Sequence, residues 1–252
     1  MKTDINEFKE TSGYEIDGVW YPRVTKIVGI KAKPALYHFY ASLPSFAEGE
    51  RIKEQSANEG TLIHEVVQDI LLGNNPEVPD EIKPSIDAFL KFHENIKIDT
   101  EKDFIERRFV NEEYKYAGTL DVLGKINGKF GILDIKTSQE IYRDYNLQTS
   151  AYMAAMITNF PKLETRWILR IDQSRPCRKC GSVLRSKGGR DKVIRNWRNG
   201  FSRNCVHEWG DAKGEVELKE FPHWHDDFHA FLGAKKLWEW ENEEILKEIG
   251  YL

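Results

Sequence analysis

Asp121, Asp134 and Lys136 are the residues of this chain best placed to do chemistry together. The pair Asn127-Gly128 lies between two apolar runs, a pattern typical of a two-residue β-hairpin turn. Such a turn pairs positions whose numbers sum to 255, so Asp121 lies opposite Asp134. Lys136 follows two residues later and points to the same face. Facing carboxylates repel each other and require a cation, so the hairpin indicates metal-ion phosphodiester chemistry.

The residues around these charges are apolar on both sides of the expected hairpin. One face is expected to hold Leu120, Val122, Ile126, Leu133 and Ile135, and the other Leu123, Phe130 and Ile132. This pattern predicts a strand pair that is covered on both faces. A solvated face of acids and a lysine is the alternative. The apolar neighbours weigh against it, because buried carboxylates are costly unless paired or bound to metal.

Three further polar residues lie in segments with helical spacing. His64 lies in GTLIHEVVQDIL, and a lone helical histidine is more often a core residue than a ligand. The zinc-protease motif is absent, because the residue four positions later is Gln68. Gln148 and Tyr152 are four residues apart and share one helix face. That helix follows the strand that carries Lys136, so we expect the amide and phenol to orient this lysine or to contact a phosphate.

Four short motifs occur in order along the chain. They are GxxxH from Gly60 to His64, GxxD from Gly118 to Asp121, DIKTS from Asp134, and QxxxY from Gln148 to Tyr152. With this set the chain resembles the PD-(D/E)XK nuclease superfamily, in its RecB-like exonuclease branch. The resemblance covers about residues 20–172, with YPRVTKIV as the lead-in and a weaker match of the final strand and helix. The four motifs together are specific where each one alone is not.

The resemblance implies a restriction-endonuclease-like mixed sheet flanked by helices and a Mg²⁺- or Mn²⁺-dependent deoxyribonuclease. It assigns one or two ions to His64, Asp121, Asp134 and the backbone carbonyl of Ile135, and these are ligands that suit hard cations. Such ions polarise the scissile phosphate and activate water. Lys136 would orient the attacking water and offset charge in the transition state.

The same resemblance suggests an acidic residue that assists the metal. Glu106 in FIERRF stands where relatives often carry such an acid, and Glu101, Glu112 and Glu113 are nearby competitors. An acid in a charged strand is usually only solvated, so both readings of Glu106 stay open.

A second set of possible ligands lies late in the chain. Cys177-x-x-Cys180 and Cys205-x-His207 supply four ligands of the kind that tetrahedral Zn²⁺ accepts. The alternatives are three reduced cysteines with a surface histidine, or an iron–sulfur cluster. Some CRISPR-associated relatives hold such a cluster with one cysteine before the nuclease core and three after it. No cysteine precedes Cys177 here, so a structural zinc site is the preferred hypothesis.

The segment around these cysteines is strongly basic. Residues 175–204 carry a net charge of +9, which leaves −13 for the rest of the chain. We expect zinc to hold this segment as a rigid finger that binds DNA phosphates, with aromatic rings that stack on unpaired bases. The candidate contacts are Arg185, Lys187, Arg190, Lys192, Arg195, Trp197 and Arg198. A charged loop that only aids solubility is the alternative.

The order of the expected elements predicts the α/β class. Helices are expected at 35–43, 48–72, 81–95 and 145–159, strands at 103–110, 116–126, 129–137, 164–172 and 214–221, and a final Trp-rich helix after them. Residues 18–29 read as a short strand or turn. This order divides the chain into a nuclease core with N-terminal helices (1–174), a zinc-knuckle basic insertion (175–210), and the final core strand and C-terminal helix (211–252).

Composition narrows the setting of the protein. No stretch approaches the ~20 apolar residues of a membrane span, and the first residues lack the apolar core of a signal peptide, so a cytoplasmic protein is expected. The expected activity is exonuclease action on single-stranded DNA or on DNA ends. A structure-specific endonuclease and a catalytically inactive nucleic-acid-binding subunit are the alternatives. Repair, phage DNA metabolism and CRISPR spacer processing remain open as pathways.

Overall fold

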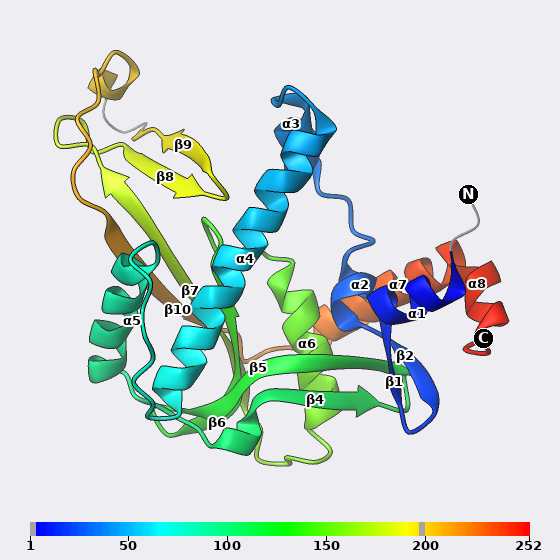
Figure 1. The fold of residues 1–252 in the computed structure, drawn as a ribbon. Helices are drawn as coiled ribbons and strands as arrows, with labels where there is room; N and C mark the ends of the chain where they lie inside the picture. The colour runs from blue at the N-terminus through cyan, green and yellow to red at the C-terminus, as the bar shows by residue number, and fades with distance from the viewer. Residues whose placement is uncertain (1–3, 197–199) are drawn as a thin grey trace.

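The computed structural model describes residues 4–196 and 200–252 and shows helices around one large mixed sheet (Figure 1). The strands of this sheet are β3 (Ile98–Asp99), β4 (Ile105–Asn111), β5 (Tyr116–Ile126), β6 (Lys129–Lys136), β7 (Thr165–Pro176), β8 (Val183–Lys187), β9 (Arg190–Ile194) and β10 (Lys213–Glu220). The order is β3-β5-β6-β7-β8-β9, while β4 also pairs with β5 and β10 with β7. The predicted α/β class with a mixed sheet is confirmed.

The central hairpin of β5 and β6 has the register predicted from the sequence. Val122 pairs with Leu133, and the pairing continues to the turn at the same sum of 255. Asn127 and Gly128 have φ angles of 51° and 82°, the left-handed values that a type I′ turn requires at both positions. β6 then runs parallel to β7, and α6 (Tyr145–Met156) makes the crossover between these two strands.

Helices cover both faces of this sheet and create two cores (Figure 1). On one face, Leu123 and Ile132 pack with side chains of α6, α2 (Val24–Val28) and α7 (His225–Glu241). The other core buries Val122, Leu133 and Ile135 against α4 (Phe46–Leu71) and α5 (Lys83–Asn95). The expectation of a hairpin covered on both sides is confirmed.

Leu120 departs from the expected face. It was expected beside Val122 but packs in the core that contains Leu123. The simple alternation fails because neither neighbouring ladder pairs Asp121: β4 contacts the residues on each side of it, and the pairing with β6 stops one residue short. The irregularity therefore lies at a predicted site residue.

α4 is the element that connects the sheet to the outer part of the molecule. It begins after Ser45, whose hydroxyl accepts a hydrogen bond from the backbone of Glu48 at 3.2 Å, and it is 26 residues long. Figure 1 shows it running across the sheet from α3 (Pro34–Ala41) at its outer end. A Cβ on Gly60 would lie 3.0 Å from the hydroxyl of Thr137, so α4 closely approaches the chain just after β6.

The N-terminal region contains two elements that the sequence did not predict, α1 (Ile5–Ser12) and β1 (Gly13–Ile16). The strand β2 (Val19–Pro22) follows them. The expectation of a strand or turn at 18–29 holds for β2 and is wrong for α2. Asp4 accepts hydrogen bonds from the backbone of Asn6 and Glu7, a capping signal that could have revealed α1.

The basic insertion leaves the sheet between β7 and β10, which pair with each other from Ser174–Lys213 to Trp167–Glu220. Its predicted start at 175 falls inside β7, which ends at Pro176. The insertion contains the β8–β9 hairpin, which reaches toward α4 (Figure 1), and the short helix η2 (Gly200–Arg203). The chain ends with α8 (Glu243–Glu248). Among the helices that the structure describes, none is long and apolar enough to cross a membrane.

Candidate active site

Asp121 stands where β5 and β6 separate. The last pair of the ladder is Val122 with Leu133, and beyond it Oδ2 of Asp121 accepts a hydrogen bond from the backbone N–H of Ile135 at 2.7 Å. A carboxylate oxygen thus replaces a strand carbonyl. In an extended strand the N–H and C=O of one residue point to the same edge. The carbonyl of Ile135 therefore also faces the edge of β6 on which Asp121 lies.

Asp134 is buried, with an exposed fraction of 0%. Its Oδ2 lies 2.7 Å from Nζ of Lys136, so the predicted grouping of two carboxylates and a lysine is present. The contact joins a charged donor to a charged acceptor. Among the residues that the structure describes, Lys136 is the only partner of this oxygen. A buried carboxylate oxygen with a single partner has capacity for a further ligand.

Gln148 and Tyr152 share one face of α6, as predicted. Nε2 of Gln148 lies 2.6 Å from the hydroxyl of Tyr152 and 3.3 Å from Oδ1 of Asp134. The amide therefore contacts the carboxylate and not Lys136. Tyr152 is only 2% exposed and packs edge-on against Phe109, and its expected contact with a phosphate stays a prediction. The pair holds Asp134 in position.

Burial controls the protonation of this group. It raises the pKa of both Asp121 and Asp134 to about 6, and the charge of Lys136 acts in the opposite direction. Burial works to lower the pKa of Lys136, but the two carboxylates raise it overall. Burial, followed by repulsion from Lys136, lowers the pKa of His64 to about 4. At neutral pH the carboxylates are charged and the imidazole can act as a ligand.

His64 and Glu106 approach the carboxylates from two other elements. Nδ1 of His64, on α4, lies 3.8 Å from Oδ2 of Asp121. Glu106, on β4, has a φ of 49°, and its Oε1 accepts a hydrogen bond from Nε2 of Gln68 at 2.6 Å. Left-handed backbone at a residue other than glycine is strained, and such strain concentrates at functional sites. The sequence missed Gln68, although its position four residues after His64 places both on one face of α4.

The chemistry of these residues fits a hard divalent cation, although their atoms are not yet gathered around one point. The donors are carboxylates and an imidazole, and Oδ2 of Asp134 has room for a ligand in place of Lys136. Among the described residues, three or more such ligand atoms lie within 4.8 Å of one another only in the cysteine cluster discussed next. Cation binding at the carboxylates therefore requires side-chain movements.

The four predicted ligands Cys177, Cys180, Cys205 and His207 come together, with all their ligand atoms within 4.8 Å of one another. The two sulfurs of Cys177 and Cys205 are 3.9 Å apart, and Sγ of Cys180 lies 3.4 Å from Nδ1 of His207. Zinc–sulfur bonds of ~2.3 Å in a tetrahedron place two sulfurs about 3.8 Å apart. The cluster has the geometry of a metal site.

Backbone contacts shape this cluster from both halves of the insertion. Arg178 donates its backbone N–H to the carbonyl of Glu208 at 2.8 Å, which joins the CxxC turn to the segment of His207. Gly181 has a φ of 72° and ends the turn. Burial works to raise the pKa of the Cys177 thiol, but hydrogen bonds from backbone groups including Lys179 N–H lower it to about 5. Thiolate is the form that binds a metal.

The predicted DNA contacts divide into two groups. Arg185 and Lys187 turn inward, where both donate to the backbone carbonyl of Thr137, the residue directly after Lys136. Arg185 also forms an ion pair with Asp172 at 2.6 Å. These two residues fasten the insertion to the end of β6. Of the others, Arg190 is half-buried, whereas Lys192 and Arg195 are exposed. Trp197 and Arg198 lie outside the described residues.

No protein-family model matches the chain, and a search of curated proteins finds no significant match.

Proposed function

We propose that this chain is a metal-dependent DNA nuclease with a restriction-endonuclease-like core, as the resemblance to RecB-like nucleases implies. The observation that carries the proposal is the group of Asp121, Asp134 and Lys136, in which Asp134 is fully buried and the other two are mostly covered. Two carboxylates with raised pKa values, of which Asp134 has only Lys136 as the partner of its Oδ2, make a costly arrangement in a core. A divalent cation and a phosphate would offset that cost.

In this proposal Asp121, Asp134, His64 and the carbonyl of Ile135 hold one or two Mg²⁺ or Mn²⁺ ions. When bound, the ions supply Lewis-acid polarisation of the phosphate and a more acidic water. Lys136, whose Nζ lies 2.7 Å from Asp134, would orient the attacking water and offset negative charge in the transition state.

Three residues act by positioning others. Gln148, held by Tyr152, fixes the rotamer of Asp134. Gln68 holds the carboxylate of Glu106 by a hydrogen bond, and Glu106 would assist in holding the metal. Such supporting contacts commonly contribute 10–100-fold in metal affinity or activity.

The cysteine cluster is proposed to hold one structural Zn²⁺. Its four ligands and its sulfur spacing support this assignment. Zinc would order the base of the insertion. Arg185 and Lys187 attach the β8–β9 hairpin to the chain directly after β6, the strand that carries Asp134 and Lys136.

The proposed substrate is single-stranded DNA or the end of a DNA duplex, because a basic insertion contacts the active-site strand. The test is incubation of wild-type protein and Mg²⁺ with labelled linear duplex, linear single strand and covalently closed circles. An exonuclease degrades the linear forms and spares the circles. Cutting of circles would indicate an endonuclease, and no cutting with intact binding would indicate an inactive binding subunit.

A further inference from the structure

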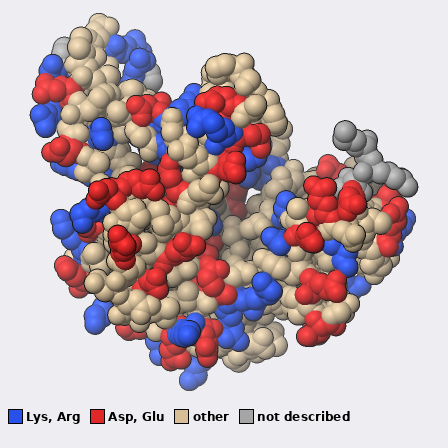
Figure 2. Space-filling view, in the orientation of Figure 1, with Lys and Arg blue, Asp and Glu red and all other residues tan. Residues whose placement is uncertain are grey.

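A pocket of about 570 Å³ opens beside the proposed active site, between α3, α4, the β8–β9 hairpin and the loop after β6. Its lining includes Thr137, which directly follows Lys136 in the chain. The charged residues that line it are all cations: Arg185, Lys187, Arg190 and Lys192. Figure 2 shows lysine and arginine side chains between the part of the molecule that holds the β8–β9 hairpin and the part that holds α3 and the start of α4. The roles proposed above for the carboxylate centre do not use this pocket.

Arg190 and Lys192 are two cations of this pocket that contact only neutral groups in the described chain. Arg190 donates to the hydroxyl of Ser42 at 3.2 Å, and its guanidinium lies 5.2 Å from the centre of the Phe39 ring. Lys192 donates to the amide oxygen of Gln139 at 2.8 Å. In the described parts of the chain, neither forms an ion pair, whereas Arg185 is paired with Asp172. The uncompensated charges of Arg190 and Lys192 are available to an anion.

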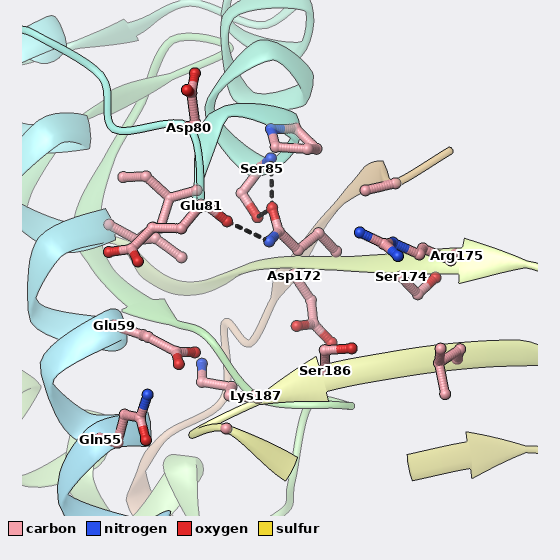
Figure 3. A pocket seen from close by; sticks show the side chains of 17 residues that line it. Gln55, Glu59, Asp80, Glu81, Ser85, Asp172, Ser174, Arg175, Ser186 and Lys187 are labelled. Carbon is pink, nitrogen blue, oxygen red and sulfur yellow. Dashed lines mark hydrogen bonds between the residues drawn. The ribbon is translucent and has the colours of Figure 1, made fainter. Parts of the chain in front are cut away.

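The other side of the same hairpin is more acidic. A second pocket, of about 360 Å³, lies there and is faced by Leu184 and Ser186 of β8. Figure 3 shows four acidic residues around it, Glu59, Asp80, Glu81 and Asp172, together with the two cations Arg175 and Lys187. Because its carboxylates outnumber its cations, this pocket attracts a phosphate less than the pocket of Arg190 beside β6 does.

The cationic pocket also presents aromatic rings and has limited width. Phe39 of α3 and Tyr142 of the loop after β6 both line it. Its volume lies in the range of about 300–1,000 Å³ that holds small molecules. The hairpin tip touches α4, since the backbone N–H of Gly188 donates to Glu59 at 2.9 Å. A single nucleotide fits a space of this size, and a base-paired duplex does not.

We propose that this pocket binds one nucleotide of an unpaired strand, with a phosphate at Arg190 and Lys192 and the base against Phe39 or Tyr142. The pocket begins one residue beyond Lys136, so this nucleotide neighbours the phosphate to be cut. The position of this nucleotide next to the phosphate to be cut rests on the proposed function. Binding of an unpaired, phosphorylated strand in the pocket does not rest on it. Base stacking on aromatic side chains typically contributes ~1–3 kcal/mol and tolerates any base.

The test measures binding without cleavage. Fluorescence anisotropy is recorded with an internally labelled six-nucleotide single strand, in buffer without added divalent cation. The double variant Arg190→Gln/Lys192→Gln should weaken binding about tenfold and lower the salt slope by about 0.7, the contribution of the one phosphate contact that is lost. Lys219→Gln/Lys236→Gln makes the same charge change at exposed positions elsewhere and should weaken binding less than twofold.

Further arms identify the phosphate and the base. Strands with a 5′-phosphate, a 3′-phosphate or neither, and a closed circle, separate a terminal phosphate from an internal one. Phe39→Leu should weaken binding of the normal strand and leave an abasic strand unchanged. Equal losses in the two double variants, or equal losses for duplex and single strand, would overturn the pocket assignment. Selective loss without any DNA cleavage would leave the pocket standing and reject the nuclease.

Discussion

The two candidate metal sites of this chain differ in what holds their ligands. The carboxylates lie on β5 and β6 amid fully buried apolar side chains, and the core fixes the strands whether or not a cation is bound. The cysteine cluster joins two loop segments at the base of an insertion, yet within the described chain it is the group of three or more ligand atoms that converges within 4.8 Å.

This difference indicates opposite relations between metal and fold. At the carboxylates the fold supplies the position, and a bound cation would relieve a cost that burial creates. At the cysteines, a bound metal would supply much of the free energy that orders the segment. Loss of a metal ligand should therefore remove chemistry at the first site and local structure at the second.

The largest effect is expected on cleavage. Asp134→Asn and Lys136→Met should each lower the rate of DNA cleavage by ~10²-fold or more, because they remove a cation ligand and a charge stabiliser. Binding of single-stranded DNA should change little. The matched control Lys125→Met, at an exposed position of the same hairpin, should cleave normally. Rapid turnover by either active-site variant would reject the assigned centre.

Metal affinity at the carboxylates should depend steeply on pH. Both carboxyls have a pKa raised to about 6, so at pH 5 most of them are protonated before a cation binds. The apparent affinity for Mn²⁺ should fall on the order of 10–100-fold between pH 7 and pH 5. His64, with a pKa lowered to about 4, stays neutral through most of this range and adds little. Titration calorimetry at the two pH values measures the change, and a constant affinity contradicts it.

Loss of zinc should weaken DNA binding more than it lowers the stability of the core. Cys177→Ser should release about one zinc per chain, the content of one four-ligand set. The loosened insertion should then bind single strands about tenfold more weakly, as lost phosphate contacts imply. Metal analysis and anisotropy measure the two effects, with thermal melting of the core as the control. Absence of zinc in wild-type protein, or an iron–sulfur absorption band, would refute the assignment.

A smaller effect tests whether the hairpin must dock on α4. Gly188 has a φ of 62°, and a Cβ there would meet the hydroxyl of Ser56 at 2.2 Å. Gly73 has a φ of 79° with nothing within 4 Å, so its alanine variant carries only the backbone strain of about 1 kcal/mol. Gly188→Ala should weaken single-strand binding severalfold beyond Gly73→Ala. Equal binding would show that docking of the tip is not required.

The features that could be predicted from the sequence are those that short local patterns specify. The Asn-Gly turn gave the register of β5 and β6, and helical spacing gave α4 and α5 to within a few residues. The CxxC and CxH pairs identified a set of ligands that the structure gathers. The Gly188-Gly189 turn was a signal for the β8–β9 hairpin that went unused.

Other features depend on contacts that no local pattern encodes. Gln68 meets Glu106 across 38 positions of the chain. Arg185 reads as a DNA contact in the sequence, and only tertiary pairing with Asp172 shows that its charge is already compensated. Likewise, the cationic pocket exists only because α3 lies opposite the hairpin.

The measurement that tests the central claim most directly is thermal melting of wild type and Asp121→Asn, with and without Mn²⁺, in a buffer that leaves zinc bound. Because the folded pKa of Asp121 is raised from 3.8 to about 6, its contribution to stability is greatest below pH 3.8 and is lost as pH rises through 6. At pH 7.5, Asp121→Asn should therefore stabilise the metal-free protein by about 2–3 kcal/mol, while the Asp134–Lys136 pair stays intact. Mn²⁺ should raise the melting temperature of wild type and have much less effect on the variant. If Mn²⁺ shifts neither protein and both melt alike, the buried carboxylates are not a cation site, and the nuclease proposal loses its physical basis.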